Sequence, residues 1–395
     1  MNIVLIITAV FIGCFLYRTY YQIRYLAGVQ RRVRHQKYHR FRWKEEADSP
    51  QPGVSVIVCA RNESDNLRHY LQALTCQKYP EFEVIVVNDG SEDDTQLVLE
   101  QSAKLFRNLR LTFVPHDAWV RSSKKLALTL AVKAAKYDYL LLTDADCRPE
   151  SPHWIEAMMR GFSKPETEIV VGYSGYFVEH TLLNRFIQYD AVFHALTYLG
   201  HALSRHPYMG VGRNLAYKKE MFFRHNGFAG TLSQRAGDDD LFVNKIATRK
   251  NTEVVLTPDS YTWSEAKHSF AEWRIQKYRH LSVAPDYRLA TRLRLTAEPV
   301  VRLVWYATFV ALMVLPALVT QLLPFSSKWL AVAVFLLSFL TQAAIIARAK
   351  RIFRVDETLS VLHLPSYLIF DLYLPLSNLA MLIRHRLRRK KESQW

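Results

Sequence analysis

Apolar and polar residues follow two different patterns along the chain, and the change of pattern separates membrane-like segments from a soluble middle. Residues 2–17, 303–327 and 329–347 are uncharged and mostly apolar. A helix needs about 20 such residues to cross a bilayer, and the two C-terminal stretches reach that length. The N-terminal stretch is shorter, but tyrosines at its C-terminal end can extend it as interfacial anchors. The pattern therefore predicts three membrane-spanning helices.

The N-terminal apolar segment has basic residues on its C-terminal side only. Lysines and arginines follow the N-terminal segment, and no acidic residue occurs before Glu45. A cleaved signal peptide has the opposite order, with its basic residues first. Because the positive-inside rule places basic flanks in the cytoplasm, the order predicts a transmembrane signal anchor over residues 1–26. A basic juxtamembrane linker over residues 27–49 follows, and the two C-terminal spans are expected at about 303–325 and 329–347.

The C-terminal membrane region, residues 300–385, holds a further apolar segment at 359–383. This segment contains two prolines and Asp371, and a basic tail over residues 384–395 follows it. Both of its ends are therefore expected in the cytoplasm. This arrangement favours an interfacial or re-entrant segment, with a fourth membrane crossing as the alternative.

Between residues 50 and 285 the pattern changes to strands that alternate with helices. Continuous apolar runs predict strands buried on both faces, and Leu67, Leu71 and Leu74 have the spacing of one helix face. This alternation predicts an α/β domain with a mostly parallel sheet. The strands are expected at 54–59, 82–87, 109–114 and 139–143, and further helices at 94–106 and 123–136.

The charge and the cysteines exclude several other kinds of protein. The formal net charge is +16, and much of the basic excess lies beside the apolar segments, where anionic lipid headgroups attract it. We therefore expect membrane lipids, and not nucleic acid, as its partner. The 4 cysteines show neither zinc-type pairing nor a disulfide framework, which fits reduced thiols in the cytoplasm.

Polar residues follow the first two predicted strands. Ala60-Arg61-Asn62-Glu63 ends the first strand, and Asn88-Asp89-Gly90-Ser91 ends the second. Neither of the common glycine-rich phosphate-binding motifs, Gly-x-x-x-x-Gly-Lys and Gly-x-Gly-x-x-Gly, follows the first strand. Side chains at two neighbouring strand ends could hold a base and its ribose, whereas an ordinary turn is the alternative for residues 88–91.

Two carboxylates follow the fourth predicted strand. Asp144 and Asp146 are separated by one alanine, so in a strand they would point to the same side. Open α/β sheets bind ligands beyond the carboxyl ends of their strands, and such a pair can hold a divalent cation through oxygen ligands. A solvated turn is the alternative.

Taken together in order, these segments resemble those of the family 2 glycosyltransferases, which are inverting enzymes of the GT-A fold. The resemblance covers roughly residues 52–287, within an expected catalytic domain over residues 50–290. It implies a Rossmann-like, mostly parallel α/β sheet. The matching segments are 54–63, 86–91, 123–128, 144–146, 210–217, 237–241 and 276–280.

The resemblance implies a role for each matching position on the donor side. Asp89 would contact the base, and Lys124 would lie near the base or the phosphates. Asp144 and Asp146 would bind the donor diphosphate together with Mg²⁺ or Mn²⁺. Of the two, Asp146 is expected to be the principal metal ligand. Ser123 replaces the usual glycine before the lysine. The other residues expected to bind the nucleotide are Ala60, Asn62 and Glu63.

Two later segments complete the expected site. By the same resemblance Asp239 is the catalytic base and Asp238 its neighbour, although a helix N-terminus enriched in aspartate would give the same sequence. Gln276 and Arg279 resemble a Gln-x-x-Arg-Trp motif, and Arg279 would contact the diphosphate. The tryptophan of that motif is His280 here, which weakens the case for a processive synthase.

These features predict an integral membrane glycosyltransferase with its catalytic domain on the cytoplasmic side of the inner or plasma membrane. It would transfer a sugar from a nucleotide-sugar donor to a lipid-linked or glycan acceptor. The alternatives are a non-catalytic, scaffolding subunit of a polysaccharide synthesis or export complex and a nucleotidyl- or phosphosugar-transferase. The intact acidic clusters weigh against the first, and the missing phosphate-binding glycine loop weighs against the second.

Overall fold

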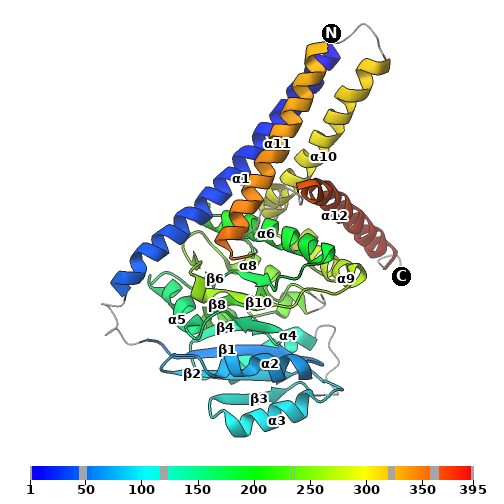
Figure 1. Ribbon diagram of the computed structural model, residues 1–395. Coiled ribbons are helices and arrows are strands. Elements are labelled where there is room, and N and C mark those ends of the chain that lie inside the picture. Colours follow the sequence, from blue (N-terminus) through cyan, green and yellow to red (C-terminus); the bar gives the residue numbers. More distant parts are fainter. Residues whose placement is uncertain are drawn as a thin grey trace. The chain divides into compact units, whose positions relative to one another are not determined.

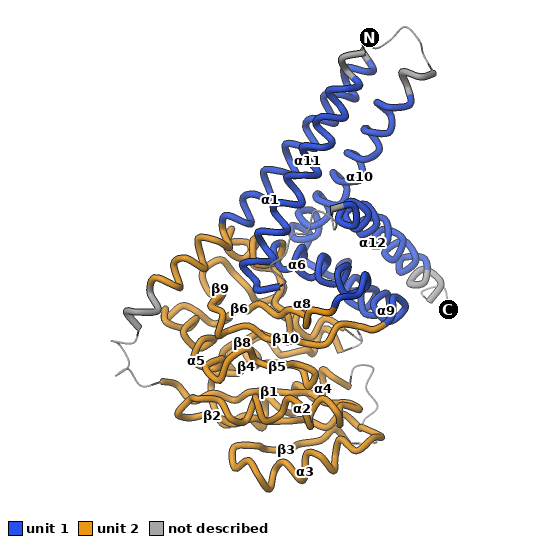
Figure 2. Tube along the Cα trace, viewed as in Figure 1, with its two compact units in different colours: residues 1–27, 180–196, 269–395 blue, residues 28–179, 197–268 orange. Residues whose placement is uncertain are grey.

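The computed structural model describes residues 2–43, 51–115, 123–232, 234, 236–318, 325–355 and 364–392. It divides the chain into two compact units (Figure 2). Unit 1 comprises residues 1–27, 180–196 and 269–395, and unit 2 comprises residues 28–179 and 197–268.

The main sheet of unit 2 has the strand order β3-β2-β1-β4-β8-β6-β9 among the described residues (Figure 1). The first four strands are parallel to one another, whereas β8 is antiparallel to both of its neighbours. This mostly parallel α/β sheet confirms the predicted fold class. The strands are β1 (Val54–Ala60), β2 (Phe82–Asn88), β3 (Leu109–Phe113), β4 (Tyr139–Asp144), β6 (Ile169–Val171), β8 (Leu215–Lys218) and β9 (Thr252–Val254).

Helices cover this sheet because their apolar faces match its buried strands. Val54, Val56 and Val58 of β1 alternate along the strand and pack in one core with Leu67 of α2 and Val98 of α3. Helix α4 packs against β1, β2 and β3. The helices of unit 2 are α2 (Ser64–Thr75), α3 (Thr95–Leu105), α4 (Ser123–Ala134), α5 (Trp154–Met159), α7 (Lys219–Arg224) and α8 (Asp240–Ile246).

A second, three-stranded sheet has the order β5-β10-β7. Its strands are β5 (Cys147–Pro149), β7 (Ser174–Tyr176) and β10 (Thr262–Ser264). Ser264 at the end of β10 is paired with Cys147 on one side and with Tyr176 on the other. Because β5 begins directly after Asp146, this small sheet continues the chain at the carboxyl end of β4.

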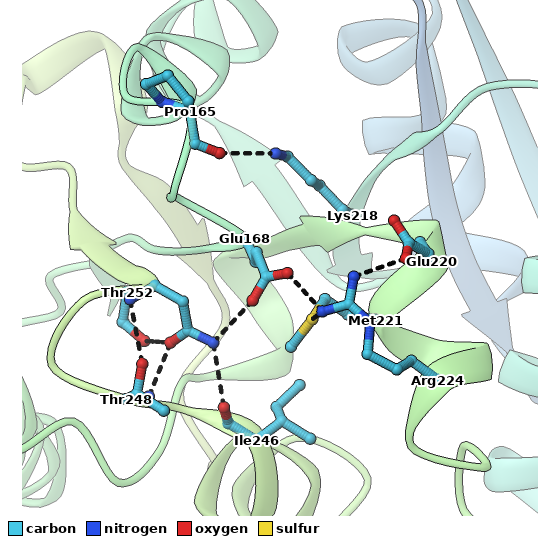
Figure 3. A network of polar contacts seen from close by, with 10 residues as sticks. Pro165, Glu168, Lys218, Glu220, Met221, Arg224, Ile246, Thr248 and Thr252 are labelled. Carbon is cyan, nitrogen blue, oxygen red and sulfur yellow. Dashed lines mark hydrogen bonds and ion pairs between the residues drawn. The ribbon is translucent and has the colours of Figure 1, made fainter.

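A polar network connects residues of β8, α7 and β9 at the end of the main sheet where β9 is the last strand (Figure 3). Glu168 accepts hydrogen bonds from Arg224 at 2.7 Å and from the amide of Asn251 at 3.0 Å. Asn251 also donates to the carbonyl of Ile246 at 3.2 Å. Burial alone would raise the pKa of Glu168, but the hydrogen bonds from Asn251 and Arg224 outweigh it and lower the pKa. The network holds the end of α8 beside β9.

Helix α1 (Asn2–Trp43) covers the exposed edge of β9 with residues that belong to unit 2. The side-chain amide of Gln36 donates to the carbonyl of Val254 at 3.0 Å and accepts from the N–H of Leu256 at 2.8 Å. Arg32 donates to the same Val254 carbonyl at 2.7 Å and pairs with Glu253. These side chains take the hydrogen bonds that a neighbouring strand would otherwise make.

Unit 1 consists of helices, and its core contains both apolar and charged layers. Phe11, Trp305, Leu312 and Ala331 form an apolar cluster in which the rings of Phe11 and Trp305 stack 5.7 Å apart. The helices are α1 up to residue 27, α6 (Leu182–Leu203) up to residue 196, α9 (Phe270–Leu281), α10 (Leu289–Leu318), α11 (Phe325–Ile352) and α12 (Leu364–Glu392).

The charged layer is centred on the buried Asp371 of α12. Its carboxylate pairs with Arg18 of α1 at 3.0 Å and with Arg302 of α10 at 3.3 Å. Tyr189 of α6 and Tyr306 of α10 donate to the same carboxylate at 3.1 Å and 2.8 Å. One buried carboxylate therefore links four helices that lie far apart in the sequence.

Four described helices are long and apolar enough to cross a membrane, which indicates a membrane protein: Ile3–Tyr38, Leu289–Val314, Lys328–Ile352 and Pro365–Leu387. The stretch predicted as a linker is helical as far as residue 43, because it has no proline before Pro50 and is rich in arginine, a good helix former. The segment predicted as interfacial belongs to α12, which continues through Pro375. The rest of that linker, residues 44–50, and residues 319–324, 356–363 and 393–395 of the predicted membrane region and tail lie outside the described residues.

Candidate functional site

The candidate site lies where the carboxyl ends of β1, β2 and β4 meet. Ala60 at the end of β1 is paired with Asn88 of β2, and Cys59 is paired with Asp144 of β4. From β1 the chain continues into β2 and β3 on one side of β1, and it then crosses to β4 on the other side of β1. The strand order therefore reverses between β1 and β4. Ligands of open α/β sheets bind in the crevice at such a point.

The loops after β1 and β2 are bonded to each other. The N–H of Asn62 donates to the hydroxyl of Ser91 at 3.0 Å, and the Asn62 side chain accepts from the N–H of Glu92 at 2.8 Å. Asn62 has a φ of 55°, a left-handed conformation that asparagine tolerates better than most residues. The N–H of Asp89 donates to the carbonyl of Ala60 at 2.8 Å. The structure thus brings Ala60, Asn62 and Asp89 together at one strand end.

The turn after β2 is also stabilised from within. The side chain of Asn88 accepts from the N–H of Ser91 at 3.0 Å, which is the local bond expected of an asparagine in a turn. The turn alternative for residues 88–91 is therefore correct for Asn88, while Asp89 is buried beside the neighbouring loop. Burial raises the pKa of Asp89, and a hydrogen bond from Ser123 opposes the shift.

Asp144 and Asp146 occupy different elements. Asp144 is the last residue of β4, whereas Asp146 lies in the turn that follows, so the expectation that both point one way as strand neighbours does not apply. The Asp146 carboxylate accepts from the hydroxyl of Ser264 at 3.0 Å and from the thiol of Cys147 at 3.3 Å. Burial raises the pKa of Glu63, a hydrogen bond from Asn66 opposes the shift, and the charges of Asp146 and Asp144 add to it.

Lys124 connects the two acidic motifs of the site. Its ammonium lies 2.9 Å from the carboxylate of Asp144 and 3.4 Å from that of Asp238. Burial alone would lower the pKa of Lys124, but the charges of Asp144 and Asp238 outweigh it and hold the pKa well above the ordinary value. Lys124 is therefore a permanent cation between residues that are 94 positions apart in the sequence (238 − 144).

Asp239 is held by two backbone N–H groups. It accepts from Gly212 at 2.6 Å and from Asp240 at 2.8 Å, and through the second bond it is the N-cap of α8. The expected helix N-terminus is thus present together with the acidic cluster. Burial raises the pKa of Asp239 and the charge of Asp238 raises it further, while Lys124 and the two N–H groups oppose the shift. A partly exposed carboxylate with a raised pKa has the character of a general base.

Lys125 and Asn214 support this arrangement, although the sequence assigned them no role. Lys125 is buried and donates to the carbonyls of Thr231 at 2.7 Å and Gln234 at 3.1 Å, which fixes the loop before Asp238. Asn214 is buried and donates to the carbonyls of Tyr173 and Ser260, each at 2.7 Å. Both residues lie inside segments that matched the family, but nothing in their spacing indicates a supporting role.

Gln276 and Arg279 lie on α9 and belong to unit 1, whereas the other predicted site residues belong to unit 2. Arg279 is exposed and Gln276 is partly buried. Between them, Lys277 forms a half-buried ion pair with Asp190 of α6 at 2.6 Å, and Trp273 packs against Phe186. Helix α9 is thereby fixed within unit 1.

The residues at the end of β4 fit a divalent cation that shares its ligands with a phosphate. Asp144 and Asp146 offer carboxylate oxygens, which Mg²⁺ and Mn²⁺ prefer. Among the described residues no group of three or more histidine, cysteine, aspartate or glutamate side chains could hold a metal by itself. Mg²⁺ is commonly bound by one or two carboxylates and completed by substrate phosphates, and the pair agrees with that pattern.

Comparison with known proteins gives the class of the chain. Residues 55–232 match the sequence model of glycosyl transferase family 2. The chain is 35% identical over 94 residues to the poly-β-1,6-N-acetyl-D-glucosamine synthase of Staphylococcus epidermidis, which is 24% of this chain and 22% of that protein. It is 29% identical over 126 residues to the glycosyltransferase AglE of Haloferax volcanii, which is 31% of this chain and 40% of that protein. The chain thus spans less than half of the length of these relatives.

The fold has a solved counterpart. The mannosyltransferase PcManGT from Pyrobaculum calidifontis, solved in complex with GDP-Man and Mn²⁺, superimposes with a TM-score of 0.56 at 20% identity. The superposition covers 90% of this chain and 99% of that one. Residues 55–232 thus match family 2 of the glycosyltransferases and the fold is GT-A-like, which confirms the resemblance. The roles of all the predicted site residues stay predictions, and Asp238, Asp239, Gln276 and Arg279 also lie beyond the matched residues.

Proposed function

We propose that the protein is a membrane-bound inverting glycosyltransferase. It transfers a sugar from a nucleotide-diphosphate sugar to a lipid-linked or glycan acceptor at the cytoplasmic face of the membrane. The observation that carries the proposal is the placement of Lys124 between Asp144 and Asp238. One cation joins the motif expected to bind the donor diphosphate to the motif expected to carry the base.

On the donor side, the loops after β1 and β2 hold the nucleotide. Asn62 and Asp89 lie in loops that are bonded to each other, and Asp89 contacts the base. Glu63 and Asp144 lie nearer the phosphates and the sugar. Asp146 and Asp144 bind Mg²⁺ or Mn²⁺, which acts as a Lewis acid on the leaving diphosphate. The complex of PcManGT with GDP-Man and Mn²⁺ supports this assignment by its fold.

On the acceptor side, Asp239 takes the proton of the attacking hydroxyl. The acceptor oxygen forms a bond to the anomeric carbon as the bond to the diphosphate oxygen breaks, and the configuration inverts. The proton passes to the Asp239 carboxylate, and the nucleoside diphosphate leaves. The raised pKa of Asp239 suits this role, because a more basic carboxylate binds the proton more readily. Asp238 keeps Lys124 in place beside it.

The membrane segments and α9 complete the proposal. Residues 1–26 anchor the catalytic domain at residues 50–290, and the C-terminal helices and the basic tail hold it at the lipid surface. Gln276 and Arg279 contact the diphosphate when donor is bound. A lipid-linked acceptor suits a catalytic domain whose own chain enters the membrane at both ends.

The alternative is a non-catalytic subunit of a polysaccharide synthesis or export complex. It would need neither the Lys124 bridge nor the raised pKa of Asp239. Incubation of the full-length protein with radiolabelled sugar nucleotides and membrane lipids separates the two functions, because only an enzyme yields a labelled product. A thermal-shift screen of donors with Mn²⁺ narrows the nucleotide, since a ligand that binds only the folded state stabilises it.

The assignment of the base is tested by Asp239→Asn. The amide cannot accept a proton, so we expect transfer to fall by about 10²- to 10⁴-fold while donor affinity stays within about threefold. The measurements are kcat with radiolabelled donor and donor affinity by calorimetry. Asp240→Asn removes one negative charge at the next residue and is the matched control. Full activity of Asp239→Asn, or a larger loss in the control, would show that another residue is the base.

A further inference from the structure

The guanidinium of Arg213 lies beside the candidate site with almost none of its hydrogen-bonding capacity used. It is stacked 4.4 Å from the ring centroid of Tyr176, and its one hydrogen bond is a long one of 3.5 Å to the carbonyl of Gly175. Among the described residues it has no carboxylate within ion-pair distance. An arginine offers five donors in a rigid fork, so most of them are available here.

The backbone of Arg213, in contrast, is held on both sides. Its carbonyl accepts from the hydroxyl of Thr143 on β4 and from that of Thr262 on β10, each at 3.1 Å. The next residue, Asn214, is fully buried and accepts from the indole N–H of Trp154 at 3.1 Å. The main sheet and the small sheet therefore fix the base of the side chain, which limits the freedom that a bound ligand would have to remove.

The surroundings of Arg213 also place it near the predicted metal ligands. Burial alone would lower its pKa, but the nearby Tyr176 and Cys147 raise it. Thr143, which donates to the Arg213 carbonyl, directly precedes Asp144. Tyr176, on which the guanidinium is stacked, is paired with Ser264, whose hydroxyl donates to Asp146. Neither carboxylate is close enough to form an ion pair with the guanidinium. A cation therefore stands beside two carboxylates without being neutralised by direct contact.

We propose that Arg213 binds a phosphate group of the ligand held at Asp144 and Asp146. The inference rests on the proposed function, and it adds a phosphate-binding residue that the sequence motifs did not assign. A planar guanidinium recognises phosphate oxygens through paired hydrogen bonds, which a lysine cannot reproduce. Two sources supply this chemistry, the diphosphate of the sugar donor and the phosphate of a lipid-linked acceptor.

The test compares the full-length wild type with Arg213→Gln and Arg213→Lys in detergent with MnCl₂. Calorimetry measures the affinities for UDP, GDP, UMP and GMP, and initial rates measure the KM for polyprenyl phosphate in vesicles. If the donor supplies the phosphate, Arg213→Gln weakens binding of the preferred diphosphate by about 10- to 100-fold, with little change for the monophosphate. If the acceptor supplies it, diphosphate affinity is unchanged and the acceptor KM rises about tenfold or more.

Several controls keep the outcomes separate. Arg224→Gln removes an exposed arginine whose carboxylate partners are Glu168 and Glu220, and we expect it to change neither binding nor KM. Thermal unfolding identifies variants that do not fold. If Arg213→Gln is unstable, Arg213→Lys, which retains the positive charge, takes its place in the test. Unchanged affinities and an unchanged KM in both Arg213 variants overturn the inference alone. A wild type that neither binds nucleoside diphosphates nor transfers sugar overturns the proposed function as well.

Discussion

Two adjacent lysines at the start of α4 have opposite environments. Lys124 faces the carboxylates of Asp144 and Asp238, whereas Lys125 faces the backbone carbonyls of Thr231 and Gln234. Burial lowers the pKa of Lys125, and the more distant Asp238 and Asp239 oppose the shift. Because successive helix residues point about 100° apart, one turn of helix can fix both the charge of the site and the loop that carries the base.

The raised pKa of Asp239 predicts the acidic limb of the pH–rate profile. The base must be deprotonated to accept a proton, so activity is lost as the pH falls through the pKa of the folded enzyme. We expect this limb at a higher pH than the value of about 3.9 of an ordinary aspartate. Measurement of kcat/KM from pH 4 to pH 8 locates it, with binding of donor over the same range as the control. A limb at the ordinary value would contradict burial as the cause.

At the level of elements, the sequence predicts the buried strands well and the short ones not at all. The strands β1, β2 and β4 are largely apolar, whereas β3 alternates apolar with polar residues, and each lies within a residue or two of its expected bounds. The strands β5, β6, β7, β9 and β10 have three residues each, which is too few to show a period of two. Their positions depend on pairing across the chain, as in the pairing of Ser264 with Tyr176.

The candidate site likewise contains residues that the sequence predicts and residues that it does not. The motif residues of unit 2 could be found from their order, because each follows a strand or begins a helix. Ser264 and Arg213 could not be assigned, since Ser264 contacts Asp146 across 118 residues and no local pattern marks it. For Asp144 and Asp146 the sequence leaves a strand continuation and a solvated turn as alternatives, and the structure places Asp146 in a turn. Contacts of this kind are decided by tertiary packing.

The small sheet is expected to tune the metal site through Ser264. Its hydroxyl donates to the Asp146 carboxylate at 3.0 Å, and loss of such a supporting bond typically weakens metal affinity by about 10- to 100-fold. We therefore expect Ser264→Ala to raise the Mn²⁺ concentration for half-maximal activity, while saturating Mn²⁺ restores most of the rate. Ser174→Ala, in the neighbouring strand of the same sheet, is the matched control. An equal effect of both changes would point to the packing of the sheet.

At the scale of the whole molecule, the stability of unit 1 depends on the carboxylate of Asp371. Removal of one partner of a buried ion pair typically costs about 3–5 kcal/mol, because the other charge stays buried without a counter-ion. Asp371→Ala leaves Arg18 and Arg302 in this position, and both are at most 3% exposed. We expect a large fall in the midpoint of thermal unfolding in detergent. Asp371→Asn, which retains one acceptor oxygen for Tyr189 or Tyr306, should lower the midpoint less, and wild-type stability in both variants would refute this role.

The contact of Gln36 with β9 has a consequence for any attempt to separate the catalytic domain from its anchor. A fragment that begins after residue 50 would lack the amide that occupies the backbone groups of Val254 and Leu256. The last strand of the sheet would then offer free N–H and carbonyl groups to the same strand of another copy. Such a fragment should self-associate, which light scattering would detect, whereas one that begins at residue 28 should stay dispersed. We therefore expect helix α1 to prevent aggregation through the edge of β9.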